Sequence, residues 1–360
     1  KTMYLNLKKY GLSDRFEQEA SLYNNLFPAR IIEQHRDLYK VVCEHGELIA
    51  GISGKLAYHA EDQMSFPAVG DWVMIDRTDN NSGNAVIKNI LGRKSVFVRQ
   101  TAGTSNEQQI VAANIDIIFI CMSLNSDFNI RRIERYLAVT WDSMATPVIV
   151  LTKSDLCDDL QEKLDELSSV SIGIDVIVCS SEDENGYQAV SSYIEKGKTI
   201  AFIGSSGVGK STLINRLAGD ENQAVQEIRK GDDKGKHTTT YRQLKLLPNG
   251  GIVIDTPGMR ELQLYTGDIS KTFEDIEELA AQCKYKNCSH VSEPGCMVRN
   301  AIENGILSEE RFGSYLKLQR EMEYSNLNSR QTKKEKINRM FGSKKEMKNA
   351  MKHLKGRKNR

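Results

Sequence analysis

The sequence predicts a protein of several domains: a small β-barrel, a mostly parallel α/β domain and an α-helical domain that holds a metal. Short β-favouring runs fill residues 29–100, apolar runs alternate with helical stretches from about residue 106, and cysteines cluster beyond residue 282. With 360 residues, 39% of them hydrophobic, the chain can form two or three packed domains, which excludes wholesale disorder. We expect an N-terminal extension, the barrel, the α/β domain, the metal-binding domain and a basic tail at residues 1–28, 29–103, 104–270, 271–329 and 330–360.

The barrel is predicted from closely spaced strands. The runs ARIIEQ, LYKVVCEH, ELIAGIS, DWVMID, AVIKNIL and SVFVRQ are separated by Gly, Asn and Asp turns. Five or six short strands match an OB-fold in size. Such a barrel can bind RNA by stacking bases on aromatic side chains, although most aromatic residues belong to a core. The candidates for stacking are Tyr39, Tyr58, Phe66 and Trp72.

The α/β domain is predicted from buried strands that alternate with helices. The expected strands lie at 115–122, 148–151, 175–179, 199–203 and 252–254, and the expected helices include 131–141 and 156–168. Continuous apolar runs of this kind indicate a mostly parallel sheet that is covered on both faces.

A phosphate-binding loop follows the strand at 199–203. The segment GSSGVGKS matches G-x-x-x-x-G-K-[ST], and the helical run STLINRLAG comes next. Glycines let backbone N–H groups turn toward phosphate oxygens, Lys210 supplies a charge for the β/γ-phosphates, and the Ser211 hydroxyl ligates Mg²⁺. The expected nucleotide contacts are Gly204, Ser205, Ser206, Gly207, Val208, Gly209, Lys210, Ser211 and Thr212.

The base that this site reads is indicated by TKSD at 152–155, which resembles the N-K-x-D guanine motif. Asp155 can accept two hydrogen bonds from guanine that adenine does not offer, and the stem of Lys153 can lie across the base. Thr152 stands where the motif has Asn, which should weaken the side-chain link to the phosphate loop. The segment CSS at 179–181 ends the next strand, so it is either an ordinary turn or, through Ser180 and Ser181, part of the base site.

Switch segments are indicated further along the chain. DTPG at 255–258 matches the D-x-x-G of GTPases, in which Asp255 would hold Mg²⁺ through water and the Gly258 N–H would meet the γ-phosphate. The segment GKHTTT at 235–240 lies between the two phosphate motifs, as a first switch should. Of its threonines we expect Thr239 to close over Mg²⁺ and the γ-phosphate, with Thr238 and Thr240 as alternatives.

The attacking water needs an unusual partner, because Met259 occupies the position where many GTPases have Gln. A thioether does not orient water. His237 is the best internal candidate, together with Lys210 and Thr239 as catalytic residues. The competing interpretation is that His237 is an exposed loop histidine and that a partner supplies the missing group.

A metal site is predicted from three thiols and one imidazole within 14 residues. This is the ligand set of a closed structural Zn²⁺ site, which has no open position for catalysis. The alternative is a chance cluster of cysteines. The expected ligands are Cys283, Cys288, His290 and Cys296.

The net charge hides an asymmetry. The chain carries 49 Lys and Arg against 48 Asp and Glu, a formal charge of +1. Residues 330–360 hold 13 of the basic and two of the acidic residues, a net charge of +11, so residues 1–329 carry −10. A basic tail on an acidic body favours contact with nucleic acid. The tail is either a helix on a phosphate backbone or a solvated disordered segment, and salt should weaken its binding in both cases.

Compartment and oligomeric state follow from what the sequence lacks. Seven cysteines, an odd number, do not suggest a disulfide framework. The longest apolar stretch, near 115–124, is far shorter than a membrane span of about 20 residues, and the first residues lack a signal-peptide core. We expect a cytoplasmic monomer with no membrane partner.

The motif order points to a family. In an ordinary GTPase the base-reading motifs come last, whereas here TKSD and CSS precede the phosphate loop, the first switch and DTPG. This circularly permuted order, between a small barrel and a Cys/His cluster, resembles the ribosome-small-subunit-dependent GTPase A family over nearly the whole chain. The resemblance implies an OB-fold, a permuted P-loop GTPase domain and a C-terminal zinc-binding domain.

The resemblance also implies a function: a GTPase that binds the small (30S) ribosomal subunit and its rRNA and acts in late maturation. GTP hydrolysis to GDP and phosphate would be stimulated by the subunit and coupled to release. One alternative is a non-hydrolysing RNA-binding scaffold with a vestigial nucleotide site, which the intact Lys210, Ser211 and Asp255 argue against. The other alternative is a P-loop ATPase or kinase, and TKSD disfavours it.

Overall fold

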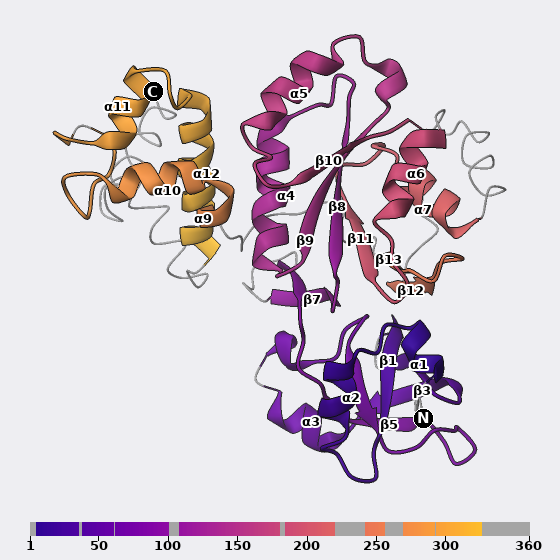
Figure 1. The fold of residues 1–360 in the computed structure, drawn as a ribbon. Helices are drawn as coiled ribbons and strands as arrows, with labels where there is room; N and C mark the ends of the chain where they lie inside the picture. Colours follow the sequence, from indigo (N-terminus) through magenta and orange to yellow (C-terminus); the bar gives the residue numbers. More distant parts are fainter. Residues whose placement is uncertain are drawn as a thin grey trace, which may run out of the picture.

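The chain folds into three bodies that follow one another in sequence (Figure 1). The structure is a computed structural model that describes residues 5–35, 38–60, 62–100, 108–180, 184–219, 242–255, 269–291 and 293–325. In Figure 1 a β-barrel lies at the bottom, an α/β body stands above it, and a helical body packs beside the α/β body. The predicted fold classes are present in the predicted order.

The first body is a closed, OB-like barrel, as predicted. Strand β1 pairs with β2 and β4, β3 pairs with β2 and β5, and β4 pairs with β5, so the five strands form a ring. The strands are β1 (Phe27–Gln34), β2 (Tyr39–Cys43), β3 (Gly46–Ile52), β4 (Trp72–Ile75) and β5 (Ala85–Ile90).

Short helices complete this body. They are α1 (Leu5–Lys9), α2 (Asp14–Ala20), α3 (Gly54–His59) and the 3-10 turn η1 (Gln63–Ser65). Leu7 of α1 and Phe16 of α2 are buried, and the Phe16 ring lies 5.8 Å from the Trp72 ring. The N-terminal extension therefore packs on the barrel core.

Two of the aromatic candidates for RNA stacking are not accessible. Trp72 is 1% exposed and Tyr39 is also buried, because both side chains point into the barrel core. Phe66 is half-buried. Tyr58, on the helix α3, is 86% exposed and is the most accessible of the four. Trp72 and Tyr39 are therefore core residues, the alternative that the sequence favoured for such aromatic side chains, and neither is available for stacking.

A hairpin links the barrel to the α/β body. Strands β6 (Val96–Gln100) and β7 (Gln108–Ala113) pair antiparallel in a sheet of their own. The Ala113 N–H donates to the Val69 carbonyl of the barrel at 2.9 Å, and the Val96 N–H donates to the Ser143 carbonyl of the α/β body at 3.0 Å. The hairpin thus bonds to both neighbours, and Figure 1 shows β7 between them.

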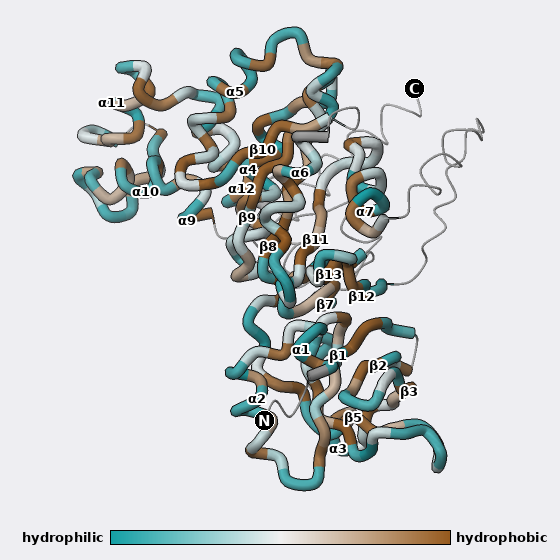
Figure 2. The backbone as a smooth tube through the Cα atoms, turned by 45° about the vertical axis from the view of Figure 1, so that its right-hand side comes forward, coloured by the Kyte–Doolittle hydropathy of each residue, from teal (hydrophilic) through white to brown (hydrophobic). Residues whose placement is uncertain are grey.

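The α/β body is built on a mostly parallel sheet in the order β10-β9-β8-β11-β13-β12. All of these strands run parallel except β12, which is antiparallel to β13. The strands are β8 (Ile117–Ser123), β9 (Thr146–Thr152), β10 (Asp175–Val178), β11 (Thr199–Ile203), β12 (Gln243–Leu246) and β13 (Ile252–Asp255). In Figure 2 the central strands carry the brown of hydrophobic residues.

Helices cover both faces of this sheet (Figure 1). Ile118 and Ile120 of β8 share a core cluster with α4 and α5, whereas Phe119 and Cys121 share another with α6 and α7. Side chains alternate between the two faces of a strand, so this split is what a doubly covered sheet requires. The elements are α4 (Ile130–Asp142), α5 (Leu160–Ser168), α6 (Glu184–Ser192), α7 (Lys210–Ala218) and the 3-10 turn η2 (Ser154–Leu156).

The third body is helical and packs on α4. Its helices are α9 (Ile269–Thr272), α10 (Glu274–Ala281), α11 (Met297–Glu303) and α12 (Glu309–Ser325). Helices α9 and α12 both contact α4. Among the described residues, no helix has the length and apolar character needed to cross a membrane.

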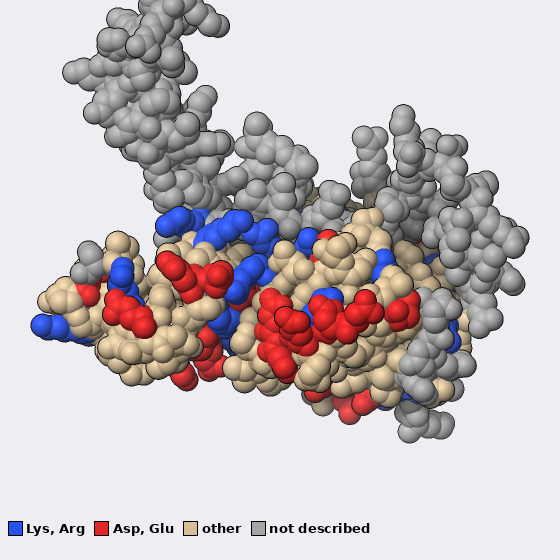
Figure 3. Space-filling model, turned by 90° about the horizontal axis from the view of Figure 1, so that it is seen from above, with Lys and Arg blue, Asp and Glu red and all other residues tan. Residues whose placement is uncertain are grey.

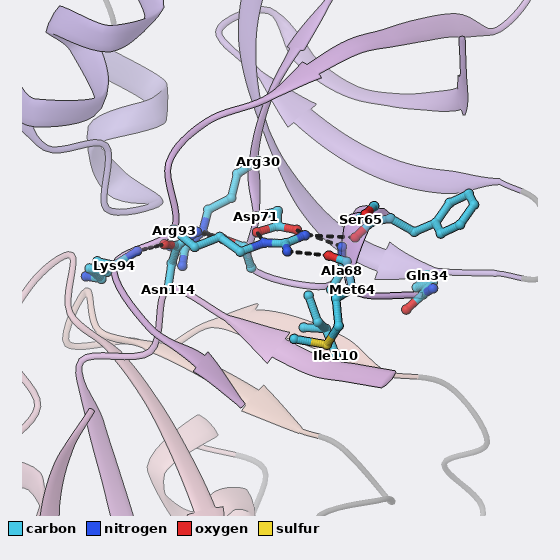
Figure 4. A network of polar contacts seen from close by, with 12 residues as sticks. Arg30, Gln34, Met64, Ser65, Ala68, Asp71, Arg93, Lys94, Ile110 and Asn114 are labelled. Carbon is cyan, nitrogen blue, oxygen red and sulfur yellow. Dashed lines mark hydrogen bonds and ion pairs between the residues drawn. The ribbon is translucent and has the colours of Figure 1, made fainter. Parts of the chain in front are cut away.

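A buried polar network joins the barrel to the α/β body, and Figure 4 shows its barrel side around Arg30, Asp71 and Arg93. Arg30 of β1, 1% exposed, donates from Nε to the Gly70 carbonyl at 3.2 Å, from Nη1 to the Tyr10 carbonyl, and from Nη2 to the Thr199 hydroxyl at 2.8 Å. Thr199 begins β11, the strand that leads into the phosphate loop. One arginine therefore holds three segments of the chain together.

The same junction contains a second set of charges. Asp71, fully buried, accepts from Arg93 at 2.7 and 2.8 Å. Asp116 accepts from the Lys94 ammonium at 2.6 Å and from the Thr199 N–H at 2.8 Å. Because each carboxylate has cationic and N–H donors, the junction buries charge without leaving it unpaired.

Candidate nucleotide site and metal centre

The phosphate loop connects β11 to α7. Gly204, Gly207 and Gly209 have φ angles of 145°, 77° and 95°, a region that side chains with a Cβ rarely adopt. A Cβ on Gly204 would also lie 2.4 Å from the Cys121 carbonyl oxygen of the neighbouring strand β8. These glycines are therefore needed for the loop conformation, as the motif predicts.

Lys210 begins α7 and folds back over the loop. Its ammonium donates to the carbonyls of Gly204 at 2.6 Å and Ser205 at 2.5 Å, and its side chain is buried. Ser211 is half-buried behind it, whereas Ser206 and Gly207 are exposed at the loop tip. A lysine, a helix N-terminus and an open glycine loop together form a site for an anion such as phosphate.

Thr152 makes the link to the phosphate loop that its replacement of Asn was expected to weaken. The Thr152 hydroxyl donates to the Val208 carbonyl at 2.6 Å, across 56 positions of sequence. The side chain is buried at the end of β9, beside the loop. The shorter threonine therefore keeps TKSD bonded to the phosphate loop.

The rest of the tetrapeptide lies beside the CSS segment. Asp155 is exposed on η2, and the Ser180 hydroxyl hydrogen-bonds its carboxylate. The Ser154 N–H donates to the Cys179 carbonyl at 3.3 Å, and Lys153 takes a left-handed φ of 58°. The structure thus brings TKSD and Ser180 together at the carboxyl end of β9 and β10.

Asp255 ends β13, which is parallel to β11, so it lies at the same edge of the sheet as the phosphate loop. The structure therefore brings this carboxylate to the side on which Ser211 lies. The other expected site residues lie outside the described residues: Ser181, His237, Thr239 and Gly258.

One contact at this site was missed from the sequence. The Arg132 guanidinium, on the first turn of α4, donates from Nη1 to the Ser205 hydroxyl at 2.7 Å and to the Asp127 carboxylate at 2.9 Å. No motif contains this arginine. The usable signal would have been its place after β8, the strand next to β11, because the loops that follow neighbouring parallel strands meet at one edge.

The four predicted metal ligands form one cluster, their ligand atoms all within 4.8 Å of one another. The Cys283 and Cys296 sulfurs lie 4.0 Å apart, and they lie 3.7 and 3.4 Å from Nδ1 of His290. A tetrahedral zinc with bonds of about 2.3 Å to sulfur and 2.0 Å to nitrogen separates its ligands by roughly 3.8 and 3.5 Å. The Cys283, Cys288, His290 and Cys296 side chains therefore fit one zinc ion.

Backbone N–H groups at the start of α11 support the thiolates. The Met297 N–H donates to the Cys283 sulfur at 3.3 Å, and the Arg299 N–H donates to the Cys296 sulfur at 3.4 Å. Burial alone would raise the pKa of Cys283, but the Met297 and Val298 N–H groups lower it. A thiol whose pKa is lowered is a better metal ligand, because the thiolate is the form that binds.

Comparison with known proteins agrees with this arrangement. The RsgA GTPase family model matches residues 90–265. A curated relative from Lactiplantibacillus plantarum, small ribosomal subunit biogenesis GTPase RsgA 2, is 54% identical over 96% of this chain and 97% of its own length. An ABC transporter model also matches residues 187–358, a range that includes the phosphate loop but not TKSD.

Two solved structures share the fold. YjeQ from Thermotoga maritima is 27% identical with a TM-score of 0.60, covering 82% of this chain and 98% of YjeQ. YloQ, described as a circularly permuted GTPase, is 24% identical with a TM-score of 0.58, covering 83% of this chain and 96% of YloQ.

Fold and site together define a circularly permuted P-loop GTPase that carries an OB-like barrel and a Cys/His cluster able to bind zinc. More particularly, the chain belongs to the RsgA GTPase family. The resemblance drawn from motif order is thereby confirmed.

Proposed function

We propose that this protein hydrolyses GTP on the small ribosomal subunit during late maturation, and that the subunit stimulates hydrolysis, which is coupled to release. The observation that carries the proposal is the 2.6 Å bond from Thr152 to Val208, because it joins a guanine-type tetrapeptide to an intact phosphate loop. The relative from Lactiplantibacillus plantarum, named for small ribosomal subunit biogenesis, supports the choice of partner.

The proposed nucleotide contacts divide into a phosphate set and a base set. Backbone N–H groups from Gly204 to Thr212 and the Lys210 ammonium would bind the phosphates, with the Gly258 N–H on the γ-phosphate. Asp155 would accept from guanine, and Lys153 would cover the base. The hydrogen bond from Ser180 to Asp155 supports this, because it orients the carboxylate, with Ser181 beside it.

Mg²⁺ would be held by oxygen ligands from Ser211, Asp255 and Thr239, and when bound it neutralises charge on the β- and γ-phosphates. The positions of Ser211 and Asp255 at one edge of the sheet support this donor set. In our proposal His237 orients the attacking water, because Met259 offers no hydrogen bond for it. His237→Ala should then lower subunit-stimulated turnover, and full retention of that turnover would remove His237 from the mechanism.

RNA contact is proposed to be local. Figure 3 shows a row of acidic side chains across one face of the molecule. The helix α5 contributes exposed carboxylates on Glu162, Asp165 and Glu166. Such a face repels a phosphate backbone, so we assign binding to the basic tail at 330–360, the barrel and the zinc-binding body. Since the ribosomal subunit is the proposed partner, we place the protein, as a monomer, in the cytoplasm.

The test is turnover of GTP and of ATP, with and without purified small subunits, for the wild type and for Lys210→Ala. We expect slow GTP hydrolysis, faster turnover with subunits, little ATP hydrolysis, and none above background for Lys210→Ala. If wild-type protein hydrolysed no GTP in either condition, the enzymatic proposal would fail and an RNA-binding scaffold would remain. Raising the salt should weaken subunit binding steeply, and removal of residues 330–360 should flatten that dependence.

A further inference from the structure

Helix α4, which carries none of the motifs described above, contacts the phosphate loop through its side chains. Arg132 of α4 contacts the Ser205 hydroxyl at 2.7 Å. Tyr136 is one turn further along α4, on the same face, and its buried hydroxyl is also hydrogen-bonded to Ser205. Burial raises the pKa of Tyr136, which keeps this phenol protonated. The side chain of one loop residue is therefore held from two positions on α4.

The Arg132 guanidinium is held in its place by a chain of hydrogen bonds from β8. The Ser123 hydroxyl donates to the Asn125 side chain at 2.9 Å, and the same oxygen accepts from the Asp127 N–H at 3.0 Å. Asp127 pairs with Arg132 at 2.9 Å. The Arg132 backbone N–H donates to the Asn129 side chain, which caps α4. An isolated surface ion pair contributes little to stability, but here the pair belongs to a connected set of hydrogen bonds that fixes the Arg132 side chain.

The opposite side of α4 is hydrogen-bonded to α12 of the helical body. Glu134 is fully buried and accepts from Arg311 at 2.7 Å and from Ser314 at 2.8 Å, both on α12. Two residues apart on a helix are about 200° apart around its axis, so Arg132 and Glu134 face opposite ways. Helix α4 therefore contacts the phosphate loop on one side and is held by α12 on the other.

We propose that Arg132 is a positioning residue for GTP hydrolysis, acting through Ser205; this inference rests on the proposed function. The Ser205 carbonyl accepts from the Lys210 ammonium at 2.5 Å, so a displaced Ser205 would also displace the groups around that lysine. Stabilising a phosphoryl-transfer transition state depends on donors held in place beforehand. Arg132 contacts the loop and no reacting atom, so it is not a catalytic residue.

The experiment measures kcat and KM for GTP, GDP affinity and thermal unfolding for Arg132→Gln, Arg132→Lys, Ser205→Ala and the double variant Arg132→Gln/Ser205→Ala. The matched control is Arg320→Gln, which removes the same charge at an exposed position on α12. All measurements are made on the full-length protein without ribosomal subunits, so that subunit binding does not enter.

We expect Arg132→Gln to lower kcat about 10- to 100-fold, the effect of losing a hydrogen bond to a charged group, with KM and GDP affinity changed less than about threefold. Arg132→Lys should recover most of the loss, because an ammonium can still donate to Ser205. The double variant should be no slower than Arg132→Gln, because both changes break one interaction. Arg320→Gln should match the wild type.

Several results would overturn the inference. These are wild-type kcat in Arg132→Gln, a rise in KM with kcat unchanged, no recovery with lysine, or additive losses in the double variant. If Arg132→Gln fails to fold, Ser205→Ala decides alone, since it must show the same kcat loss at wild-type stability. Failure of the proposed function is distinct, because the wild type itself would then show no turnover.

Discussion

The junction between the barrel and the α/β body depends on Arg30, and Arg30→Met should weaken it measurably. Each of its three hydrogen bonds from a charged donor contributes about 1.5–3 kcal/mol, or roughly 5–9 kcal/mol together. Burial lowers the pKa of Arg30 to about 10, from an ordinary value of 12.5, so holding this charge costs about 3 kcal/mol. Methionine removes both the hydrogen bonds and the cost of the buried charge. The difference predicts a loss of about 2–6 kcal/mol in the free energy of unfolding.

The two tryptophans allow this loss to be assigned. Trp72 lies in the barrel, where its ring centroid is 5.4 Å from the Arg30 guanidinium, and Trp141 lies on α4. In a Trp141→Phe background, Trp72 fluorescence reports barrel unfolding in urea, and circular dichroism reports the helices. We expect coincident transitions in the parent and an earlier barrel transition in Arg30→Met. The control Arg77→Met removes a partly exposed ion pair of the barrel and should cost far less than Arg30→Met.

The argument for Arg30 would be refuted if Arg30→Met cost no more than Arg77→Met. It would also be refuted if stability fell while the two transitions stayed coincident, because Arg30 would then stabilise the protein without joining its parts. The loss of stability in Arg30→Lys should lie between the losses in Arg30→Met and Arg77→Met, since a lysine keeps the charge but has no planar fork of donors to reach three acceptors.

Three further outcomes are expected. Thr152→Val leaves the buried Val208 carbonyl without its 2.6 Å donor, so GDP affinity in a fluorescence titration should fall about 5- to 30-fold, whereas Thr152→Ser should retain it. Cys296→Ser should lower bound zinc, measured by a metal-sensitive dye, and reduce helicity with little effect on GDP binding, because metal binding and folding of the helical body are coupled. Arg311→Met breaks the buried ion pair with Glu134, which keeps Arg131 and Ser314 as partners, and should cost up to about 3 kcal/mol in urea unfolding. If Arg311→Met/Glu134→Met is no more stable than the single variant, the weakened pairing of Glu134 is not the cause.

The predictable parts of this protein are those in which chemistry restricts the sequence. Phosphate needs glycines at positive φ, so the loop from Gly204 could be located and its neighbouring strand named. A structural zinc site needs four sulfur or nitrogen ligands, so the cluster could be predicted from three thiols and one imidazole within 14 residues. The order of TKSD and DTPG indicated a permuted sheet, because each motif must follow a particular strand. Strand and helix types followed from apolar runs, although α5 begins at Leu160 and not near 156, since η2 intervenes.

The parts that were missed depend on tertiary geometry. Whether Thr152 could reach the phosphate loop depended on how closely β9 approaches it, and no motif encodes that distance. Arg132 and Glu134 look like an ordinary charged helix face, and only packing shows that they bind different bodies.

Strand β12 begins a few positions after the expected first switch and pairs with barrel strand β1, at Gln243 and Glu33. The Gln243 side chain also donates to Glu33 at 2.7 Å, and Arg242 donates to the Ile110 carbonyl at 2.9 Å. The start of β12 is thus bonded both to the barrel strand β1 and, through Arg242, to the hairpin strand β7. Strand β12 also pairs with β13, the strand that ends at Asp255, so a displacement of the barrel would be transmitted through β12 to the edge of the sheet where the phosphate loop lies.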